Sequence, residues 1–105
     1  MANNGVRQES SVVANDGILT ISGALTFATA TAVFLQSRNF LLKNKVNKID
    51  LSCVNVADSA AVGFLIEIII FMKKQNSKFV FCNISTVLKS IIKVFAVDEL
   101  ITKFT

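Results

Sequence analysis

The spacing of hydrophobic and polar residues predicts strands that alternate with helices. Two short β-rich runs, residues 11–14 and 18–22, flank Asn15-Asp16-Gly17, which favours a tight hairpin because Asp-Gly supports positive φ. Further along the chain, apolar residues recur every two positions in the predicted strands and about every 3.6 positions in the predicted helices. These are expected at the following residues: strands at 46–53 and 78–84, helices at 29–42, 60–75 and after Ser85, and a short extended tail at 100–102.

This order predicts an α/β fold. Strands joined through helices run parallel, whereas the opening hairpin adds an antiparallel edge. We therefore expect a mixed four-stranded sheet with a parallel core and an antiparallel edge hairpin, packed with about three helices. Thr29, Asp58-Ser59 and Ser85 stand where each helix begins and are suited to cap it.

Composition limits the chemistry that is available. The chain has 105 residues, of which 52% are hydrophobic and 17% charged, and it has no His, Pro, Trp or Tyr. This length predicts one domain, which we place at residues 10–105 after a flexible N-terminus at 1–9. Without histidine there is no imidazole base and no His-based metal site, so we expect no enzyme activity, no catalytic residue, no metal and no cofactor.

The mean hydropathy of +0.59 raises the question of a membrane span. The longest apolar stretch, residues 60–72, is shorter than the roughly 20 residues that a helical span needs. The polar first ten residues have no apolar core of a signal peptide. We therefore expect a cytoplasmic protein without direct membrane insertion, in which Cys53 and Cys82 are small buried residues, with Cys53 on the same strand face as Ile49 and Leu51.

The net charge of +4 comes largely from lysines. Two groups, at positions 43, 45 and 48 and at positions 73, 74 and 78, follow predicted helices, where cations complement the helix dipole. The sequence has no Arg-rich tract and no aromatic residues interleaved to stack on bases. We therefore expect no nucleic-acid binding.

The loop at Asp58-Ser59 leads from a strand into a helix N-terminus. A serine there lies near unpaired N–H groups, which stabilise negative charge, including that of a phosphate. Alternatively, Asp58 or Ser59 simply caps the helix.

The helix after this loop has more apolar side chains than one buried face needs. If Glu67 and Lys74 mark its outward centre, Val62, Leu65, Ile69 and Met72 point inward. The residues near the outward line are Ala60, Gly63, Phe64, Ile70 and Phe71. They either contact a neighbouring helix or form a protein-binding face, on which small Ala60 and Gly63 allow close approach.

Several segments together resemble a STAS domain over about the whole chain after residue 10. They are residues 17–23, Leu25-Thr26-Phe27-Ala28-Thr29, the strand with its Asp58-Ser59 loop, Cys82-Asn83-Ile84, and Phe95-Ala96-Val97-Asp98-Glu99-Leu100. Residues 25–29 and 97–100 resemble the MlaB-like branch, the small STAS subunits of the ABC transporters that move phospholipid to maintain outer-membrane lipid asymmetry in Gram-negative bacteria.

The two branches of the family use this loop differently, and the MlaB-like branch has a single Thr or Ser directly after the Asp, a position that Ser59 occupies. The sigma-regulatory pattern is Asp-Ser-Ser-Gly-Leu-Gly, and its second serine is phosphorylated. Here Ala60 and Ala61 replace the second serine and the glycine after it, which leaves Ser59 as the candidate phosphosite.

The resemblance implies a non-enzymatic subunit that binds and stabilises or regulates the ATPase subunit. That ATPase would share an assembly with permease and substrate-binding subunits, which would hold the protein peripherally at the inner membrane. An isolated chain could pair with itself through the same face. The alternative is an anti-sigma factor antagonist in a phosphorylation-controlled partner switch. The expected partner-binding residues are Asp58, Ser59, Ala60, Gly63, Phe64, Glu67 and Phe71.

Overall fold

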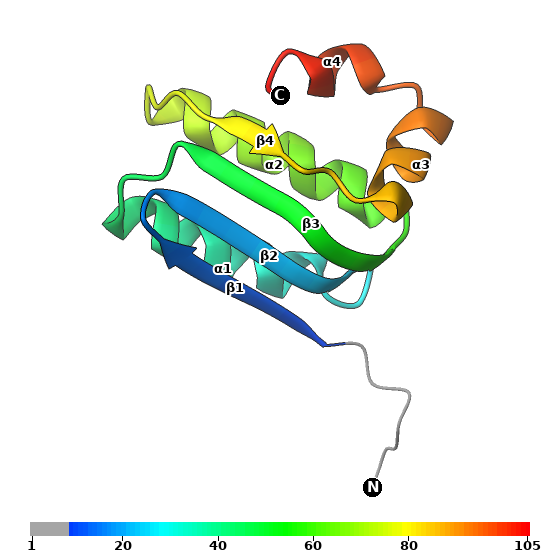
Figure 1. Ribbon diagram of the computed structural model, residues 1–105, viewed down its shortest axis with the longest axis horizontal. Helices are drawn as coiled ribbons and strands as arrows, with labels where there is room; N and C mark the ends of the chain where they lie inside the picture. Colours follow the sequence, from blue (N-terminus) through cyan, green and yellow to red (C-terminus); the bar gives the residue numbers. More distant parts are fainter. Residues whose placement is uncertain (1–8) are drawn as a thin grey trace, which may run out of the picture.

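A mixed four-stranded sheet forms the centre of the fold in the computed structural model, which describes residues 9–105 (Figure 1). The strands are β1 (Ser10–Asn15), β2 (Ile18–Leu25), β3 (Lys48–Ala57) and β4 (Val80–Cys82), and they are ordered β1-β2-β3-β4. β1 pairs antiparallel with β2, whereas β3 and β4 continue in parallel. The predicted sheet is therefore confirmed. Apart from Glu9, the predicted flexible segment 1–9 lies outside the described residues.

The hairpin between β1 and β2 forms as the Asp-Gly pair predicts. Asn15 pairs with Ile18, and the two residues between them have φ values of 51° at Asp16 and 80° at Gly17. Both values belong to the tight turn that matches the twist of antiparallel strands. The Gly17 carbonyl then accepts hydrogen bonds from the backbone N–H groups of Asn47 and Lys48, which fixes the turn against the start of β3.

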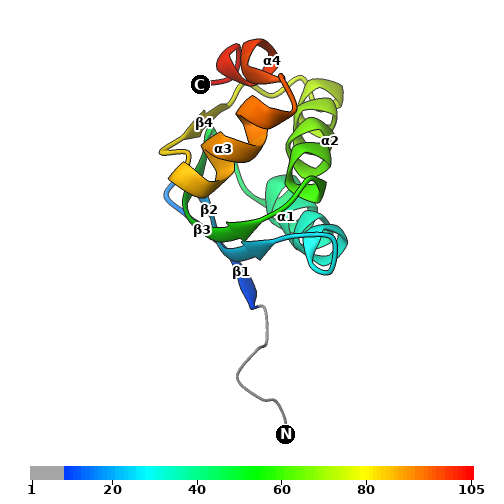
Figure 2. The ribbon, with the colours of Figure 1, turned by 90° about the vertical axis from the view of Figure 1, so that its right-hand side faces the viewer.

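Two long helices, α1 (Ala30–Lys43) and α2 (Ala60–Lys74), cover one face of the sheet. α3 (Thr86–Val94) lies across the C-terminal ends of β3 and β4, and α4 (Asp98–Thr102) lies beyond the β4 edge (Figure 2). Within residues 9–105, the opposite face of the sheet carries no helix. None of the helices described is both long and apolar enough to cross a bilayer.

The predicted extended tail at residues 100–102 is wrong, because these residues belong to α4. Its first turn carries Asp98 and Glu99, whose charges favour a helix N-terminus. Residues 9–105 thus form four helices, one more than the period of the sequence indicated.

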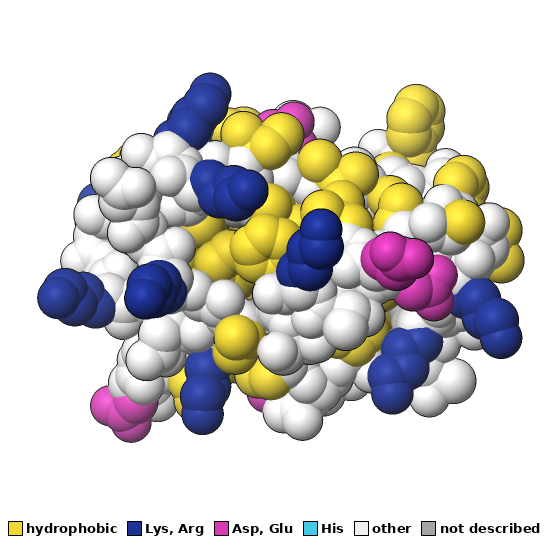
Figure 3. Space-filling view, turned by 90° about the horizontal axis from the view of Figure 1, so that it is seen from above, with side chains coloured by type: hydrophobic (Ala, Val, Ile, Leu, Met, Phe, Trp, Pro, Cys, Tyr) yellow, Lys and Arg dark blue, Asp and Glu magenta, His cyan; other side chains and the backbone are white. Residues whose placement is uncertain are grey.

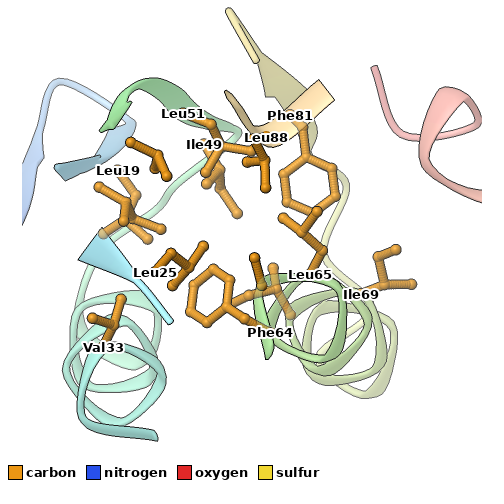
Figure 4. Close-up of a cluster of buried hydrophobic side chains, with 14 of the residues drawn as sticks. Leu19, Leu25, Val33, Ile49, Leu51, Phe64, Leu65, Ile69, Phe81 and Leu88 are labelled. Atoms are coloured by element: carbon orange, nitrogen blue, oxygen red, sulfur yellow. The ribbon is translucent and has the colours of Figure 1, made fainter. Parts of the chain in front are cut away.

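The core lies between the sheet and the two long helices (Figure 4). α2 contributes the inward residues that its period predicted, since Val62, Leu65, Ile69 and Met72 are all buried. The largest fully buried side chains come from all three parallel strands and from α2 and α3: Leu19, Ile21, Leu25, Ile49, Leu51, Ile68, Phe81 and Leu88. Ser85 caps α3 as expected, its side chain accepting a hydrogen bond from the Leu88 N–H.

Cys53 does not share the buried face of Ile49 and Leu51. β3 has one residue more than β2 between the pairs Thr20–Asp50 and Ser22–Cys53, so the strict alternation of faces is lost there. Leu51 and Val54 point inward, whereas Cys53 is exposed. Cys82 is half-buried, so the expectation of two buried cysteines is wrong for Cys53 and only partly met for Cys82.

Candidate docking site at the Ser59 end

Asp58 joins the two loops that meet at the C-terminal ends of β2 and β3. Its Oδ1 accepts a hydrogen bond of 2.9 Å from the Ala60 N–H, and its Oδ2 accepts one of 3.0 Å from the Phe27 N–H. Its own N–H donates to the Leu25 carbonyl at 3.4 Å. Asp58 therefore caps α2 and also holds the loop before α1 in place.

Ser59 occupies the N-cap position of α2 without capping it. The residue is exposed, and its hydroxyl makes no capping hydrogen bond. Asp58 takes that role, so the Ser59 hydroxyl faces solvent at the end of a helix. The next residue, Ala60, is half-buried. A group attached to Ser59 would lie beside both the helix N-terminus and the Asp58 carboxylate.

The loop between β2 and α1 presents an aromatic ring to solvent. The Thr29 hydroxyl oxygen accepts a hydrogen bond from the Thr26 N–H and donates one to the Ala24 carbonyl, both at 2.9 Å. Thr29 thus fixes the loop rather than capping α1 with its side chain, which corrects the cap expected from the sequence. Phe27 stands at the top of this loop and is 90% exposed.

Phe27 was not among the residues expected at the site. The sequence did offer one signal for Phe27. It is a large apolar residue between the end of a strand and the start of a helix, inside the segment 25–29. Hydrophobic periodicity cannot identify such a residue, because a loop has no regular pattern of buried and exposed positions.

A hollow of about 300 Å³ lies between the first turns of α1 and α2. It brings together four of the residues expected to bind a partner, together with three from α1: Ala30, Thr31, Phe34, Ala60, Gly63, Phe64 and Glu67. A Cβ added at Gly63 would meet nothing within 4 Å. No neighbour in the described chain therefore requires glycine at this position, and the space above it is open.

Phe64 is part of the wall of this hollow and is not an exposed anchor. Only 3% of the residue is exposed, and its ring packs edge-on against Phe34 of α1 with centroids 6.4 Å apart. Phe71 is half-buried against the same ring at 6.5 Å and lies outside the hollow. The expectation of exposed phenylalanines is wrong for Phe64, and contact with the neighbouring helix explains both side chains.

A second polar group lies away from this site, on the open face of the sheet. The Asp50 carboxylate accepts hydrogen bonds from the Ser52 N–H at 2.8 Å and from the Asn83 side chain at 3.5 Å. Burial alone would raise the pKa of Asp50, but these hydrogen bonds, with one from the Ser52 hydroxyl, bring it below its ordinary value. Burial and the Asp50 charge raise the pKa of the Cys82 thiol.

Neither the residues around Ser59 nor the polar group around Asp50 forms a metal centre. In the described part of the chain, no three His, Cys, Asp or Glu residues are placed to hold a metal ion together. The chemistry of the Ser59 end therefore consists of an exposed hydroxyl, a capped helix N-terminus, an exposed aromatic ring and a small hollow.

The family model of the STAS domain matches residues 7–105, so the chain belongs to the STAS domain family. Among solved structures, it is similar to the anti-sigma factor antagonist SpoIIAA in its unphosphorylated form. The TM-score is 0.65 with 11% sequence identity, and the match covers 91% of this chain and 84% of that one. At this identity the likeness shows the fold alone. No curated protein matches the sequence.

These matches confirm the STAS resemblance and the α/β fold inferred from the sequence. STAS domains are in general regulatory or interaction domains that bind other proteins. The narrower resemblance to MlaB-like subunits has no counterpart among the matches and stays a prediction.

Proposed function

We propose that this protein is a non-enzymatic STAS module that binds a protein partner through its Ser59 end, which we define as Phe27, Asp58, Ser59 and the hollow beside them. The observation that carries this proposal is the 90% exposure of Phe27 on a loop fixed by Asp58. A large apolar side chain on a fixed stretch of backbone is an efficient anchor, because little backbone entropy is lost when it is buried. Burial of Phe27 would contribute roughly 1.5 to 3 kcal/mol to binding.

The open space at Gly63 supports the same surface. Glycine inside a helix costs up to about 1 kcal/mol relative to alanine, and no neighbour here demands it. Small residues at Ala60 and Gly63 let a partner approach the backbone of α2 closely. The buried Phe64 ring forms part of the wall of this hollow.

The kind of partner binding we favour is that of an anti-sigma factor antagonist, controlled by phosphorylation of Ser59. The fold shared with SpoIIAA supports this class, and the exposed Ser59 hydroxyl supplies an acceptor. Phosphate would add about −2 charge next to the Asp58 carboxylate. The repulsion would weaken the hydrogen bond from the Phe27 N–H to Asp58, shift the Phe27 ring and release the partner.

A second candidate is a subunit of an ABC-type phospholipid transport system, bound to the ATPase subunit at the inner membrane. One observation favours it: Ala60 stands where the sigma-regulatory pattern has its phosphorylated serine. As a transporter subunit, the protein would bind the ATPase permanently through its Ser59 end and stabilise it. Ser59 would then be a contact residue and not a switch.

Co-expression with each candidate partner, followed by affinity capture of the complex, tests the shared surface. The partners to use are the ATPase and the anti-sigma kinase encoded nearest the gene. Phe27→Asp and Ser59→Lys should each abolish capture, because they place charge at the centre of the surface. Val94→Asp is the matched control, since Val94 is 75% exposed on α3. Unchanged capture of both site variants would overturn the proposal.

Phosphorylation separates the two candidates. The purified protein is incubated with the kinase and ATP and analysed by mass spectrometry, with Ser59→Ala as the control. Phosphate at Ser59 together with loss of binding supports the switch. Absence of phosphate on a chain that binds the ATPase rules out the switch and supports the transporter subunit.

A further inference from the structure

Lysines from separate parts of the chain meet at the end of the molecule opposite Ser59. Because β3 and β4 are parallel, both begin at the same edge of the sheet, and the helices that precede them end there. Residues far apart in sequence therefore gather at this edge. We call this surface the Lys end and define it by Lys43, Lys45, Lys48, Lys73, Lys78 and Lys103.

Two adjoining hollows, of about 600 and 570 Å³, form the Lys end. They share Asn47, Ser77 and Lys78, and the residues that line them include no acidic side chain. Asp16 lies nearby in the hairpin turn but lines neither hollow. All six lysines are exposed, so their ammonium groups are available to a ligand.

Apolar side chains line part of each hollow. Phe79 and Phe104 stack with ring centroids 5.4 Å apart in one hollow, and Leu42, which is 58% exposed, lies at the rim of the other. Figure 3 shows the resulting pattern in its left half, where dark blue side chains surround a yellow depression. The surface therefore combines a ring of cations with accessible apolar side chains.

The residue type of the cations at the Lys end indicates what kind of negatively charged ligand this surface suits. Protein interfaces are enriched in arginine and depleted in lysine, whereas this ring consists of lysine alone. Lysine is a mobile point charge on a long apolar stem, suited to a diffuse negative surface on which the stem can rest. Clusters of four to eight basic residues, here combined with apolar side chains, are typical of surfaces that adsorb to anionic lipid.

We infer that the Lys end binds the surface of an anionic phospholipid bilayer. The molecule extends 44 Å along its longest axis, and the starts of β3 and β4 at the Lys end lie toward the opposite side from the start of α2 at the Ser59 end (Figure 1). A protein bound to lipid through the Lys end therefore keeps its docking surface free.

Co-flotation with lipid vesicles tests this inference. Vesicles of phosphatidylcholine with about one third phosphatidylglycerol are compared with phosphatidylcholine alone, at about 100 mM salt, where charges act over about 10 Å. The full chain should float with the anionic vesicles only, and more salt should release it. Lys78→Glu/Lys103→Glu should weaken binding at least about tenfold.

The pair Lys89→Glu/Lys93→Glu is the matched control, because it makes the same change of charge on the exposed side of α3. It should reduce binding by no more than about twofold, and Lys43→Glu/Lys45→Glu is a second test pair if the first fails to fold by circular dichroism. Equal loss in both pairs would overturn the inference in favour of a net-charge effect. Binding of soluble polyglutamate, with none to anionic vesicles, would overturn it in favour of an acidic protein ligand.

Discussion

The two ends of this molecule use the same topology to present opposite kinds of surface. At the Ser59 end, strands stop and helices begin, so backbone N–H groups are available and Asp58 uses two of them to fix the loops. At the Lys end, helices stop and strands begin, so carbonyl groups are available and the side chains that accumulate are flexible cations.

The Ser59 end has a fixed backbone, whereas the Lys end has mobile side chains. Hydrogen bonds hold the backbone that carries Phe27, which suits recognition of one partner. The lysines have long side chains that reach toward any negative surface. Substitution of Asp58 or of the buried residues beneath the hollow should therefore change stability, and substitution of Phe27 should change mainly specific binding, whereas substitutions at the Lys end should leave stability nearly unchanged.

The largest effect is expected from Phe64→Ala. The side chain is buried between α1 and α2, so its removal leaves a cavity and should lower the free energy of unfolding by about 3–5 kcal/mol. Phe27→Ala, in contrast, should change stability by less than about 0.5 kcal/mol while weakening partner binding. Urea denaturation measures both values. Equal destabilisation by the two substitutions would contradict the assignment of Phe64 to the core and of Phe27 to the surface.

Asp58→Ala should lower the free energy of unfolding by about 1–2 kcal/mol, because the N–H groups of Phe27 and Ala60 both lose their acceptor. Asp58→Asn keeps one good acceptor and should lose less. Thermal denaturation gives the order, and hydrogen exchange at Phe27 should speed up in both variants. If alanine proves no less stable than asparagine, Asp58 does not hold the two loops together.

Gly63→Ala should raise the free energy of unfolding by up to about 1 kcal/mol, since the added methyl group meets no neighbour and alanine favours the helix. The same methyl group should weaken partner binding by narrowing the space above α2. Denaturation and titration of the partner measure the two effects. A stabilised variant with unchanged affinity would show that the partner does not approach the backbone here.

The smallest effect is expected at Asp50, which belongs to neither end. Its pKa is lower in the folded chain than its ordinary value near 3.8, so its hydrogen bonds stabilise the fold at neutral pH and this contribution is lost as the pH falls through the folded value. Asp50→Asn should cost less than about 1 kcal/mol at pH 7. The difference between variant and parent should shrink as the pH falls below 3.8 and vanish once the pH is well below the folded pKa. A difference that persists at low pH would exclude this explanation.

Much of the fold follows from the sequence because its signals are local. The Asp16-Gly17 turn and the inward period of α2 each depend on a few neighbouring residues. Cys53 could not be placed in this way, because the extra residue in β3 becomes visible only through its pairing with β2. α4 is only five residues long, too short for its period to distinguish it from an extended tail.

The candidate site was predictable only in part, for a similar reason. The period of α2 identified Ala60, Gly63 and Glu67, which do line one hollow. It could not show that Phe64 packs on Phe34, because that contact depends on how α1 lies beside α2. The two groups of lysines likewise look independent along the chain, and only the parallel order of β3 and β4 brings them together.

The central claim, that partner binding belongs to the Ser59 end, is tested most directly by nuclear magnetic resonance. Amide signals of the labelled protein are followed while the ATPase or the anti-sigma kinase is added. We expect changes to concentrate at residues 25–31 and 57–67 and to spare residues 43–48 and 73–79. Binding that instead perturbs the Lys end and leaves Phe27 and Ser59 unchanged would contradict it.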